Sequence, residues 1–186
     1  MFNVKNLKVA YGESTVINNL DLDLKKGEIL AVMGRNGMGK TTLFKSLIGV
    51  IDCKSPSSIT LEDQELASAP SFERVRSGMA YVPQGRMIYP TLTVKENIMV
   101  GMDVSNKKTV PDEIYEIFPV LKEMSKRKGG NLSGGQQQQL AIARALVTEP
   151  KVLLLDEPTE GIQPSIIKEL ARTLCKVRDM KNISII

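Results

Sequence analysis

The sequence predicts an α/β fold with a largely parallel sheet, because apolar strand patterns alternate with helical patterns along the chain. Three apolar runs have the length of buried strands, namely Ile29–Met33, Met79–Pro83 and Val152–Leu155. Helical spacing of apolar residues occurs between them, at Lys40–Ile48 and Gln136–Val147. With 186 residues, the chain fits a single domain.

The N-terminal part of the chain adds two further strands. Val4–Ala10 reads as a strand, and Val16–Leu24 alternates in the manner of a half-buried strand. The predicted helix Lys40–Ile48 carries its apolar residues on one side, and Gly49 ends it.

The C-terminal part is predominantly helical. Val94–Met124 has a mostly helical pattern that Pro111 and Pro119 interrupt. Ser165–Met180 is an amphipathic helix, and its inward residues are Ile166, Ile167, Leu170, Leu174 and Val177. Asn182–Ile186 begins another strand within which the sequence stops, so we interpret the chain as C-terminally truncated.

Composition narrows the function classes. No apolar run approaches the ~18–20 residues that span a bilayer, and the N-terminus lacks the layout of a signal peptide, so a cytoplasmic protein is expected. The absence of histidine excludes a His-based catalytic triad and argues against a zinc site. Cys53 and Cys175 form no metal or redox spacing. Basic residues are scattered and aromatic residues make up 4%, so no nucleic-acid partner is expected despite a net charge of +4.

A glycine-rich loop at residues 34–41 (GRNGMGKT) satisfies the pattern G-x-x-x-x-G-K-[ST] between a predicted strand and a predicted helix. Gly34, Gly37 and Gly39 allow the backbone amides to wrap around phosphate oxygens, while the following helix points its positive end at the same anion. Lys40 would reach the β- and γ-phosphates, and the Thr41 hydroxyl would bind Mg²⁺. The strand–loop–helix context disfavours the alternative, an ordinary glycine-rich turn.

Two carboxylates, Asp156 and Glu157, follow the apolar strand Val152–Leu155. Strand ends in such sheets open onto the ligand crevice. Asp156 would hold Mg²⁺ through water, and Glu157 would orient or deprotonate the attacking water. The alternative is an acidic loop after a core strand, but the preceding phosphate loop favours the functional interpretation.

A third motif, LSGGQ at Leu132–Gln136, directly precedes a helix. Ser133 is a candidate N-cap, and the two glycines after it expose backbone amides. The segment therefore offers a second helix start suited to binding an anion.

Taken in chain order, the segments GRNGMGKTT, LSGGQ and VLLLDEP resemble the Walker A, signature and Walker B motifs of ABC transporter ATPases. That resemblance implies a P-loop NTPase fold with a RecA-like core, an antiparallel β subdomain and a helical subdomain at about residues 90–133. It implies binding and hydrolysis of ATP with Mg²⁺. It also implies two membrane permease subunits, a second ATPase subunit in a heterodimer or homodimer, and, indirectly, a periplasmic solute-binding protein. The chain would lie at the cytoplasmic face of the inner membrane.

Site residues carried over from the family extend beyond the motif chemistry. Tyr11 matches the aromatic that stacks on adenine, although a packing tyrosine is the alternative. Gln84 matches the Q-loop glutamine that meets Mg²⁺ and water and senses the membrane partner, although a surface-loop glutamine is the alternative. The resemblance also assigns nucleotide contacts to Asn36 and Thr42, and contacts with the ATP of the opposite subunit to Ser133, Gly134, Gly135 and Gln136.

Longer stretches are similar to ATPases of branched-chain amino acid and urea importers. The segment Tyr81–Asn97 fits that group broadly, whereas Gly135–Leu146 and Glu157–Ile167 favour the urea branch. Two departures qualify the resemblance: Gln163 stands where most ABC ATPases have the D-loop aspartate, and the position of the switch histidine falls beyond Ile186. The sequence therefore predicts the ATPase of a urea importer, with a branched-chain amino acid or short-chain amide importer as the alternative.

Other ATP-binding classes fit less well. Mechanical ATPases of DNA maintenance insert long coiled coils between the phosphate loop and the LSGGQ segment. No sustained heptads occur between these motifs here. A non-catalytic nucleotide-binding subunit would lack Glu157, which is present. A translation-factor protein would bring two cassettes in one chain.

Overall fold

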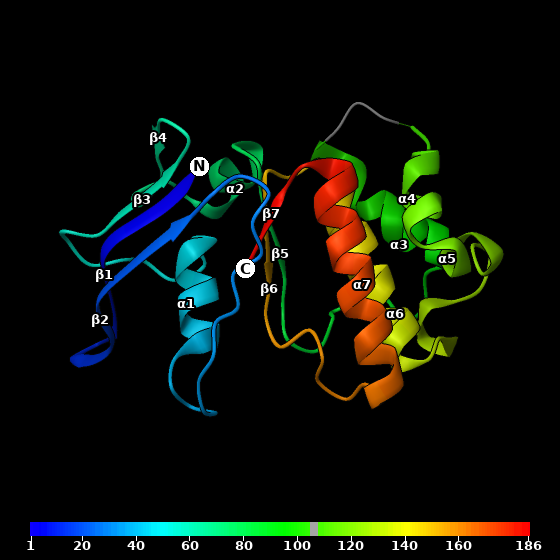
Figure 1. Ribbon diagram of the computed structural model, residues 1–186, viewed down its shortest axis with the longest axis horizontal. Helices are drawn as coiled ribbons and strands as arrows, with labels where there is room; N and C mark the ends of the chain where they lie inside the picture. Colours follow the sequence, from blue (N-terminus) through cyan, green and yellow to red (C-terminus); the bar gives the residue numbers. More distant parts are fainter. Residues whose placement is uncertain (105–107) are drawn as a thin grey trace.

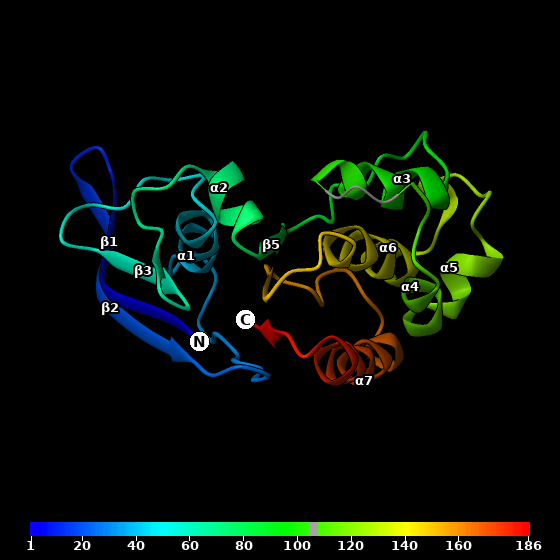
Figure 2. The same cartoon turned by 90° about the horizontal axis from the view of Figure 1, so that it is seen from above.

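The computed structural model describes residues 1–104 and 108–186, and it places three parallel strands between a β-rich half and a helical half (Figure 1). An antiparallel sheet and helix α1 (Lys40–Leu47) lie on one side, and helices α3 to α7 lie on the other. The view from above shows the same separation (Figure 2). Within the described ranges, no helix is both long and apolar enough to cross a membrane.

The antiparallel sheet has the order β2-β1-β3-β4, and its strands are β1 (Phe2–Tyr11), β2 (Ser14–Leu24), β3 (Ser58–Leu61) and β4 (Gln64–Glu65). The predictions for the first two strands are confirmed. Their apolar residues alternate, so one face packs on α1 while the other carries polar side chains. The sequence prediction missed β3, β4 and the short helix α2 (Ser71–Arg76).

The parallel sheet has the order β5-β6-β7, formed by β5 (Met79–Val82), β6 (Val152–Leu155) and β7 (Ser184–Ile185). Every residue of β6 is buried, as the uninterrupted apolar run predicts for a strand covered on both faces. The predicted sheet was largely parallel, but the larger of the two sheets is antiparallel. The mixed architecture implied by the family resemblance is the correct description.

The predicted strand Ile29–Met33 is not formed. Ile29 makes one isolated bridge to Ile185, and the Leu30 amide donates to the Ile185 carbonyl at 2.9 Å. Because β7 spans only two residues, the rest of the segment has no ladder partner in the described sheet. Met33 is consequently 92% exposed, although it belongs to an apolar run.

The helical half has the predicted helices, and two of them begin at the prolines that interrupt the helical pattern of the sequence. Its elements are α3 (Val94–Val100), a 3₁₀ turn (Gly101–Val104), α4 (Asp112–Ile117), α5 (Pro119–Glu123), a second 3₁₀ turn (Gly129–Asn131), α6 (Gly134–Leu146) and α7 (Pro164–Lys181). Pro111 precedes α4 and Pro119 opens α5, where a missing amide removes no helical hydrogen bond. Residues 105–107 of the predicted helical stretch lie outside the described residues.

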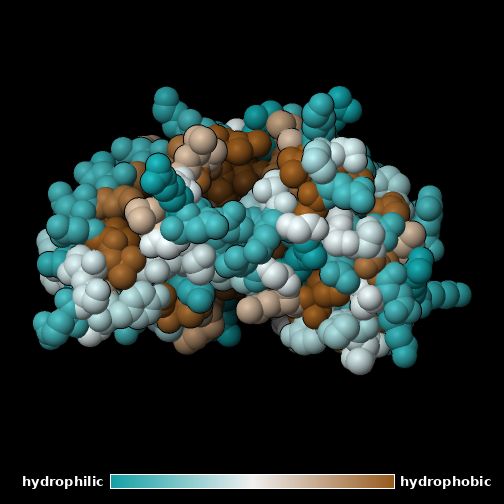
Figure 3. Space-filling model, turned by 90° about the horizontal axis from the view of Figure 1, so that it is seen from below, coloured by the Kyte–Doolittle hydropathy of each residue, from teal (hydrophilic) through white to brown (hydrophobic). Residues whose placement is uncertain are grey.

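Helix α7 packs on the core through one stripe. Leu170 and Val177 are buried, while Ile166, Ile167 and Leu174 are half-buried. The predicted inward face is therefore correct, but only its centre is fully covered. A hollow with exposed apolar surface lies between the two halves on the face shown in Figure 3.

Arg74 on α2 is a buried arginine that joins three segments. Its guanidinium donates to the carbonyls of Ser46 and Leu47 at the end of α1, at 2.7 and 2.9 Å. It also donates to Ala67 and Ala69, both at 2.9 Å. The side chain, which is only 2% exposed, thus satisfies carbonyls that the end of a helix leaves unpaired.

Replacing Arg74 with Met is expected to destabilise the fold by about 3 kcal/mol, because several buried carbonyls lose their donor. Urea unfolding of the purified chain measures this difference. Arg76→Met is the matched control, since Arg76 is exposed and its guanidinium lies 5.4 Å from the centroid of the Phe72 ring. Equal unfolding midpoints for the two variants would contradict the structural role of Arg74.

Candidate active site

The loop at residues 34–39 turns into α1 through two glycines in the left-handed region. Gly37 has φ 80° and Gly39, the N-cap of α1, has φ 91°. A Cβ on Gly39 would also lie 3.0 Å from Cγ1 of Val16, so the loop approaches β2 closely there. Gly34 has no positive φ, so the backbone freedom predicted for it is not used.

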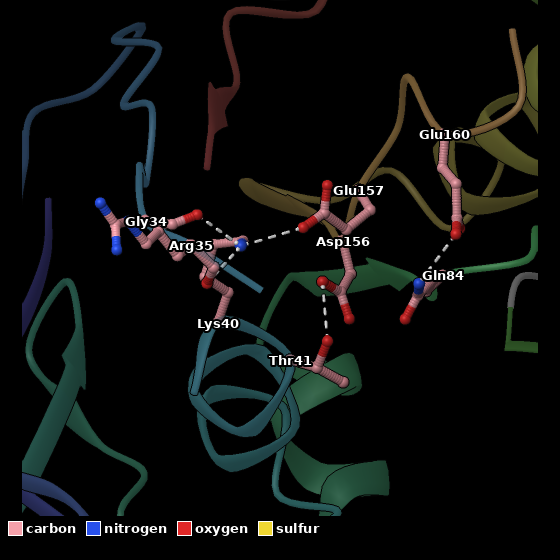
Figure 4. A network of polar contacts seen from close by, with 8 residues as sticks. All are labelled: Gly34, Arg35, Lys40, Thr41, Gln84, Asp156, Glu157 and Glu160. Carbon is pink, nitrogen blue, oxygen red and sulfur yellow. Dashed lines mark hydrogen bonds and ion pairs between the residues drawn. The ribbon is translucent and has the colours of Figure 1, made fainter. Parts of the chain in front are cut away.

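Lys40 begins α1 and reaches back across this loop (Figure 4). Its ammonium group donates to the carbonyls of Gly34 at 2.8 Å and Arg35 at 3.2 Å. The same nitrogen lies 3.2 Å from Oε1 of Glu157. The loop lysine and the predicted catalytic glutamate therefore form an ion pair at the carboxyl end of β6.

Thr41 and Asp156 come together as the sequence predicts. The Thr41 hydroxyl donates to Oδ1 of Asp156 at 3.2 Å, although the two residues are far apart in the chain (Figure 4). The other oxygen, Oδ2, accepts from the hydroxyl of Tyr81 at 3.2 Å. Asp156 is 2% exposed, so its orientation is fixed by these two donors.

Tyr81 is a site residue that the sequence analysis did not single out. Burial raises the pKa of its phenol, and the adjacent Asp156 carboxylate raises it further. The hydroxyl therefore stays protonated well above neutral pH and serves as a hydrogen-bond donor to Asp156. The available signal was its place in β5 shortly before Gln84, since strand ends of one parallel sheet meet at one edge.

The P-loop cavity, with a volume of about 420 Å³, lies over the start of α1. Its lining residues are Val16, Asn36, Gly37, Gly39, Lys40, Thr41, Thr42, Gln84 and Glu157. All except Val16 were predicted site residues. Gly34 is outside the lining and contributes its carbonyl to Lys40.

Tyr11 lies at the margin of this region, with its hydroxyl 3.4 Å from the Thr42 hydroxyl oxygen. Its side chain is 52% exposed, so it is not the packing residue that the alternative interpretation required. An exposed ring beside a phosphate-binding loop can stack on a planar base. The stacking role itself stays a prediction.

Gln84 is exposed, and its amide nitrogen donates to Oε1 of Glu160 at 3.1 Å (Figure 4). It also lines the P-loop cavity, together with Thr41 and Glu157. Its predicted catalytic and metal-binding roles remain predictions.

The donors fit Mg²⁺ better than a softer metal. Thr41, Asp156 and Gln84 offer oxygen atoms, and Mg²⁺ is commonly held by one or two carboxylates together with substrate phosphates. Residues 1–104 and 108–186 hold no cluster of three or more His, Cys, Asp or Glu side chains suited to a metal. The site therefore suits a cation that arrives with a phosphate ligand.

The signature segment, Leu132–Gln136, forms the start of α6. The Ser133 hydroxyl accepts from the Gln136 amide at 3.3 Å, and the Gln136 side chain accepts from the Ser133 amide at 3.0 Å. This reciprocal pair confirms the predicted N-cap. A Cβ on Gly135 would lie 2.6 Å from Cγ2 of Ile166, so α7 packs directly against the segment.

The signature segment does not join the P-loop cavity of its own chain. None of its residues lines that cavity, and α1 and α6 stand in opposite halves of the molecule (Figures 1 and 2). The structure thus brings together the phosphate loop and the two carboxylates after β6, and it leaves Ser133, Gly134, Gly135 and Gln136 apart from them.

Comparison with known proteins gives one consistent family. A family model described as ABC transporter matches residues 17–160. BraG of Pseudomonas aeruginosa, a high-affinity branched-chain amino acid transport ATP-binding protein, is 39% identical over 96% of this chain and 77% of its own length. LivF of Archaeoglobus fulgidus, a probable branched-chain amino acid transport ATP-binding protein, is 38% identical over 100% of this chain and 80% of its own.

A solved structure agrees with these relatives. The dimeric structure of MJ0796, a bacterial ABC transporter cassette, covers 100% of this chain and 87% of its own length with a TM-score of 0.81 and 25% identity. The described fold is therefore that of such a cassette.

Proposed function

Because this chain belongs to the family of ABC transporter ATP-binding subunits, we propose that it powers the import of branched-chain amino acids. The observation that carries the ATPase part is the grouping of Lys40, Thr41 and Glu157 around one cavity, with Asp156 hydrogen-bonded to Thr41 beside it. The choice of solute is supported by the two relatives at 39% and 38% identity.

Urea is the second candidate solute. The stretches Gly135–Leu146 and Glu157–Ile167 resemble the urea branch of the same importer group. Neither stretch lines a site for a transported solute, because the solute is selected by the permease and the periplasmic solute-binding protein. Only transport can therefore distinguish urea from an amino acid or a short-chain amide.

The geometry suggests how the residues divide the work of hydrolysis. Lys40 moves from Glu157 to the β- and γ-phosphates of ATP, and the amides of the loop and of α1 surround the same oxygens. Thr41 and Asp156 would hold Mg²⁺, which would supply positive charge against the phosphates. Glu157, released from Lys40, accepts a proton from the attacking water, and Gln84 orients that water. Tyr81 keeps Asp156 in place.

A second ATPase subunit completes the site. The signature segment of each subunit would face the phosphates held by the other, because it cannot reach its own cavity in the described fold. Ser133 and the amides of Gly134 and Gly135 would supply donors there, and Gln136 would fix their position through the capping pair. The two subunits could be identical chains or paralogues.

The permease would dock beside Gln84, on the helical half. A cavity of about 250 Å³ lies between β5, α3 and α6, and its rim includes Tyr89 and Val100, which are 46% and 38% exposed. The guanidinium of Arg144 lies 5.4 Å from the centroid of the Tyr89 ring. Exposed apolar residues in a groove are typical of a protein interface. This docking would place the chain at the cytoplasmic face of the membrane.

Reconstitution tests the proposal and separates the two solutes. The ATPase, its partner subunit, the permease and the solute-binding protein are placed in liposomes, and ATP hydrolysis is measured with leucine, urea or acetamide. Stimulation by leucine supports the branched-chain amino acid assignment. Stimulation by urea alone would replace it with the urea assignment, and no stimulation by any of these solutes would contradict both.

Replacing Ser133 with Ala and with Asp separates the cap from the proposed phosphate contact. Ser133→Ala should lower stability by about 1 kcal/mol because α6 loses its N-cap. Ser133→Asp should keep the cap, since aspartate is a good N-cap residue, yet its charge should repel the partner's phosphates. Thermal unfolding and ATP turnover are measured for both. Full turnover by the aspartate variant would exclude the phosphate contact.

A further inference from the structure

We infer that Arg86 is a positioning residue for ATP hydrolysis. It holds the loop at residues 84–87 (the Gln84 loop) against the turn after Glu157 and against the first turn of α6. The inference rests on the proposed function, because that function assigns the turn after Glu157 to the nucleotide site of this subunit and the start of α6 to the nucleotide site of the partner subunit. It concerns a residue that lines neither the P-loop cavity nor the docking cavity of the permease.

The backbone around Arg86 is held in an uncommon conformation. Gly85, Arg86 and Met87 have φ values of 77°, 66° and 44°, so three successive residues lie in the left-handed region. For residues other than glycine this conformation is sterically unfavourable. Such strain persists only where surrounding contacts hold the chain in place.

The side chain of Arg86 supplies one set of those contacts. Its Nη2 donates to the Glu160 carbonyl at 2.7 Å. The guanidinium also lies against two glycines, because a Cβ placed on Gly134 or on Gly161 would be 3.4 Å from its nitrogens. One planar group therefore touches the turn after β6 and the first residue of α6 together.

Two neighbouring contacts complete the connection. The carbonyl of Arg86 accepts from Nη2 of Arg144, a residue in the last turn of α6, at 3.2 Å. Gln84 donates to the side chain of Glu160 at 3.1 Å (Figure 4). The Gln84 loop is thus tied to both ends of α6 and twice to Glu160.

Electrostatics argues that this arrangement does not serve helix stability. The guanidinium is a permanent cation beside the N-terminus of α6, where the helix already presents partial positive charge. A cation there is unfavourable. The same charge is favourable once an anion lies at that helix start, as the proposed contact with the partner's phosphates requires.

The connection has a functional consequence because Glu157 precedes the turn and Ser133 precedes α6. Under the proposed function, Glu157 acts on the nucleotide bound to its own subunit, whereas Ser133 contacts the nucleotide bound to the partner subunit. Arg86 would keep the two at a fixed separation, so that both nucleotides are engaged together. Its loss should reduce turnover and leave nucleotide binding at the P-loop cavity unchanged.

Three variants test the inference in the complete transporter and in the purified chain. They are Arg86→Ala, Arg86→Lys, which keeps one donor for Glu160, and Arg172→Ala, which removes an exposed guanidinium from α7 as the matched control. Backbone hydrogen exchange reports on residues 133–136 and 158–161, a fluorescent ADP analogue reports on the P-loop cavity, and turnover is measured at saturating ATP.

For Arg86→Ala we expect faster exchange in both segments, nucleotide affinity within about twofold of wild type, and turnover reduced by about 10- to 100-fold. Arg86→Lys should recover part of the turnover, and Arg172→Ala should match the wild type. Unchanged exchange, or unchanged turnover, would overturn the inference. Loss of nucleotide affinity would also overturn it, since Arg86 would then act on its own cavity or on the fold.

The exchange measurement keeps this inference separate from the proposed function. If none of the solutes stimulates ATP hydrolysis by the wild type, the importer assignment is contradicted. Hydrogen exchange in the purified chain still confirms or excludes the connection made by Arg86. Conversely, solute-stimulated turnover that Arg86→Ala leaves intact contradicts only the positioning role.

Discussion

Replacing Glu157 with Gln is expected to reduce ATP turnover by about 10²- to 10⁴-fold, because the amide cannot accept the proton of the attacking water. Turnover at saturating ATP measures the effect in the reconstituted transporter. The carboxylate lies at the end of β6, beside the P-loop cavity, in a backbone with φ 49°. That conformation directs the side chain towards Lys40, 3.2 Å away, and hence towards the place of the terminal phosphate.

Binding of ATP should survive the same substitution. Glu157 holds Lys40 in an ion pair that must open before the ammonium group reaches a phosphate. An amide holds the lysine less strongly than a carboxylate, so affinity for ATP should equal or exceed that of the wild type. Glu123→Gln, in an exposed position of α5, removes one carboxylate elsewhere and should change neither quantity. Retained turnover in Glu157→Gln would show that another group accepts the proton.

The sequence alone predicts those elements whose residues are close together in the chain. Helices α1, α6 and α7 have apolar residues at helical spacing, and their observed ends fall within two residues of the predicted ones. The phosphate loop, the signature segment and the two carboxylates are likewise local patterns, so their chemistry can be inferred without any tertiary contact.

Elements that depend on distant partners are not predictable in this way. The four-residue strand β3 and the two-residue strand β4 are too short to show a period, and β3 is stabilised by pairing with β1. The opposite error occurred at Ile29–Met33, where the local pattern is strand-like but β7 offers a partner only at its start. Strand formation is therefore decided by the neighbour as well as by the sequence of the strand.

The site shows the same division. Lys40, Thr41 and Asp156 follow from motifs, whereas Tyr81, the second donor to Asp156, belongs to none of them and is indicated only by its place near the end of β5. The contacts of Arg86 with Glu160 likewise join residues that only the fold brings together. Residues that bind the substrate are thus recognisable from the sequence, whereas residues that position them are found only in the structure.

Replacing Lys40 with Ala should weaken ATP binding by about 30- to 1,000-fold, which corresponds to roughly 2–4 kcal/mol for one partly buried cation acting on phosphates. Lys40 is the cation that the loop itself positions, since the carbonyls of Gly34 and Arg35 accept from it. Titration with a fluorescent ATP analogue measures the loss.

Lys45→Ala is the matched control, because Lys45 lies in the last turn of the same helix and does not line the P-loop cavity. It should retain wild-type affinity. Lys40→Ala also leaves Glu157 without its partner at the cavity, and an unpaired carboxylate there repels phosphate, so the double variant Lys40→Ala/Glu157→Gln should recover part of the lost affinity. Equal affinities for Lys40→Ala and wild type would mean that the loop amides alone bind the phosphates and that the lysine acts only on Glu157.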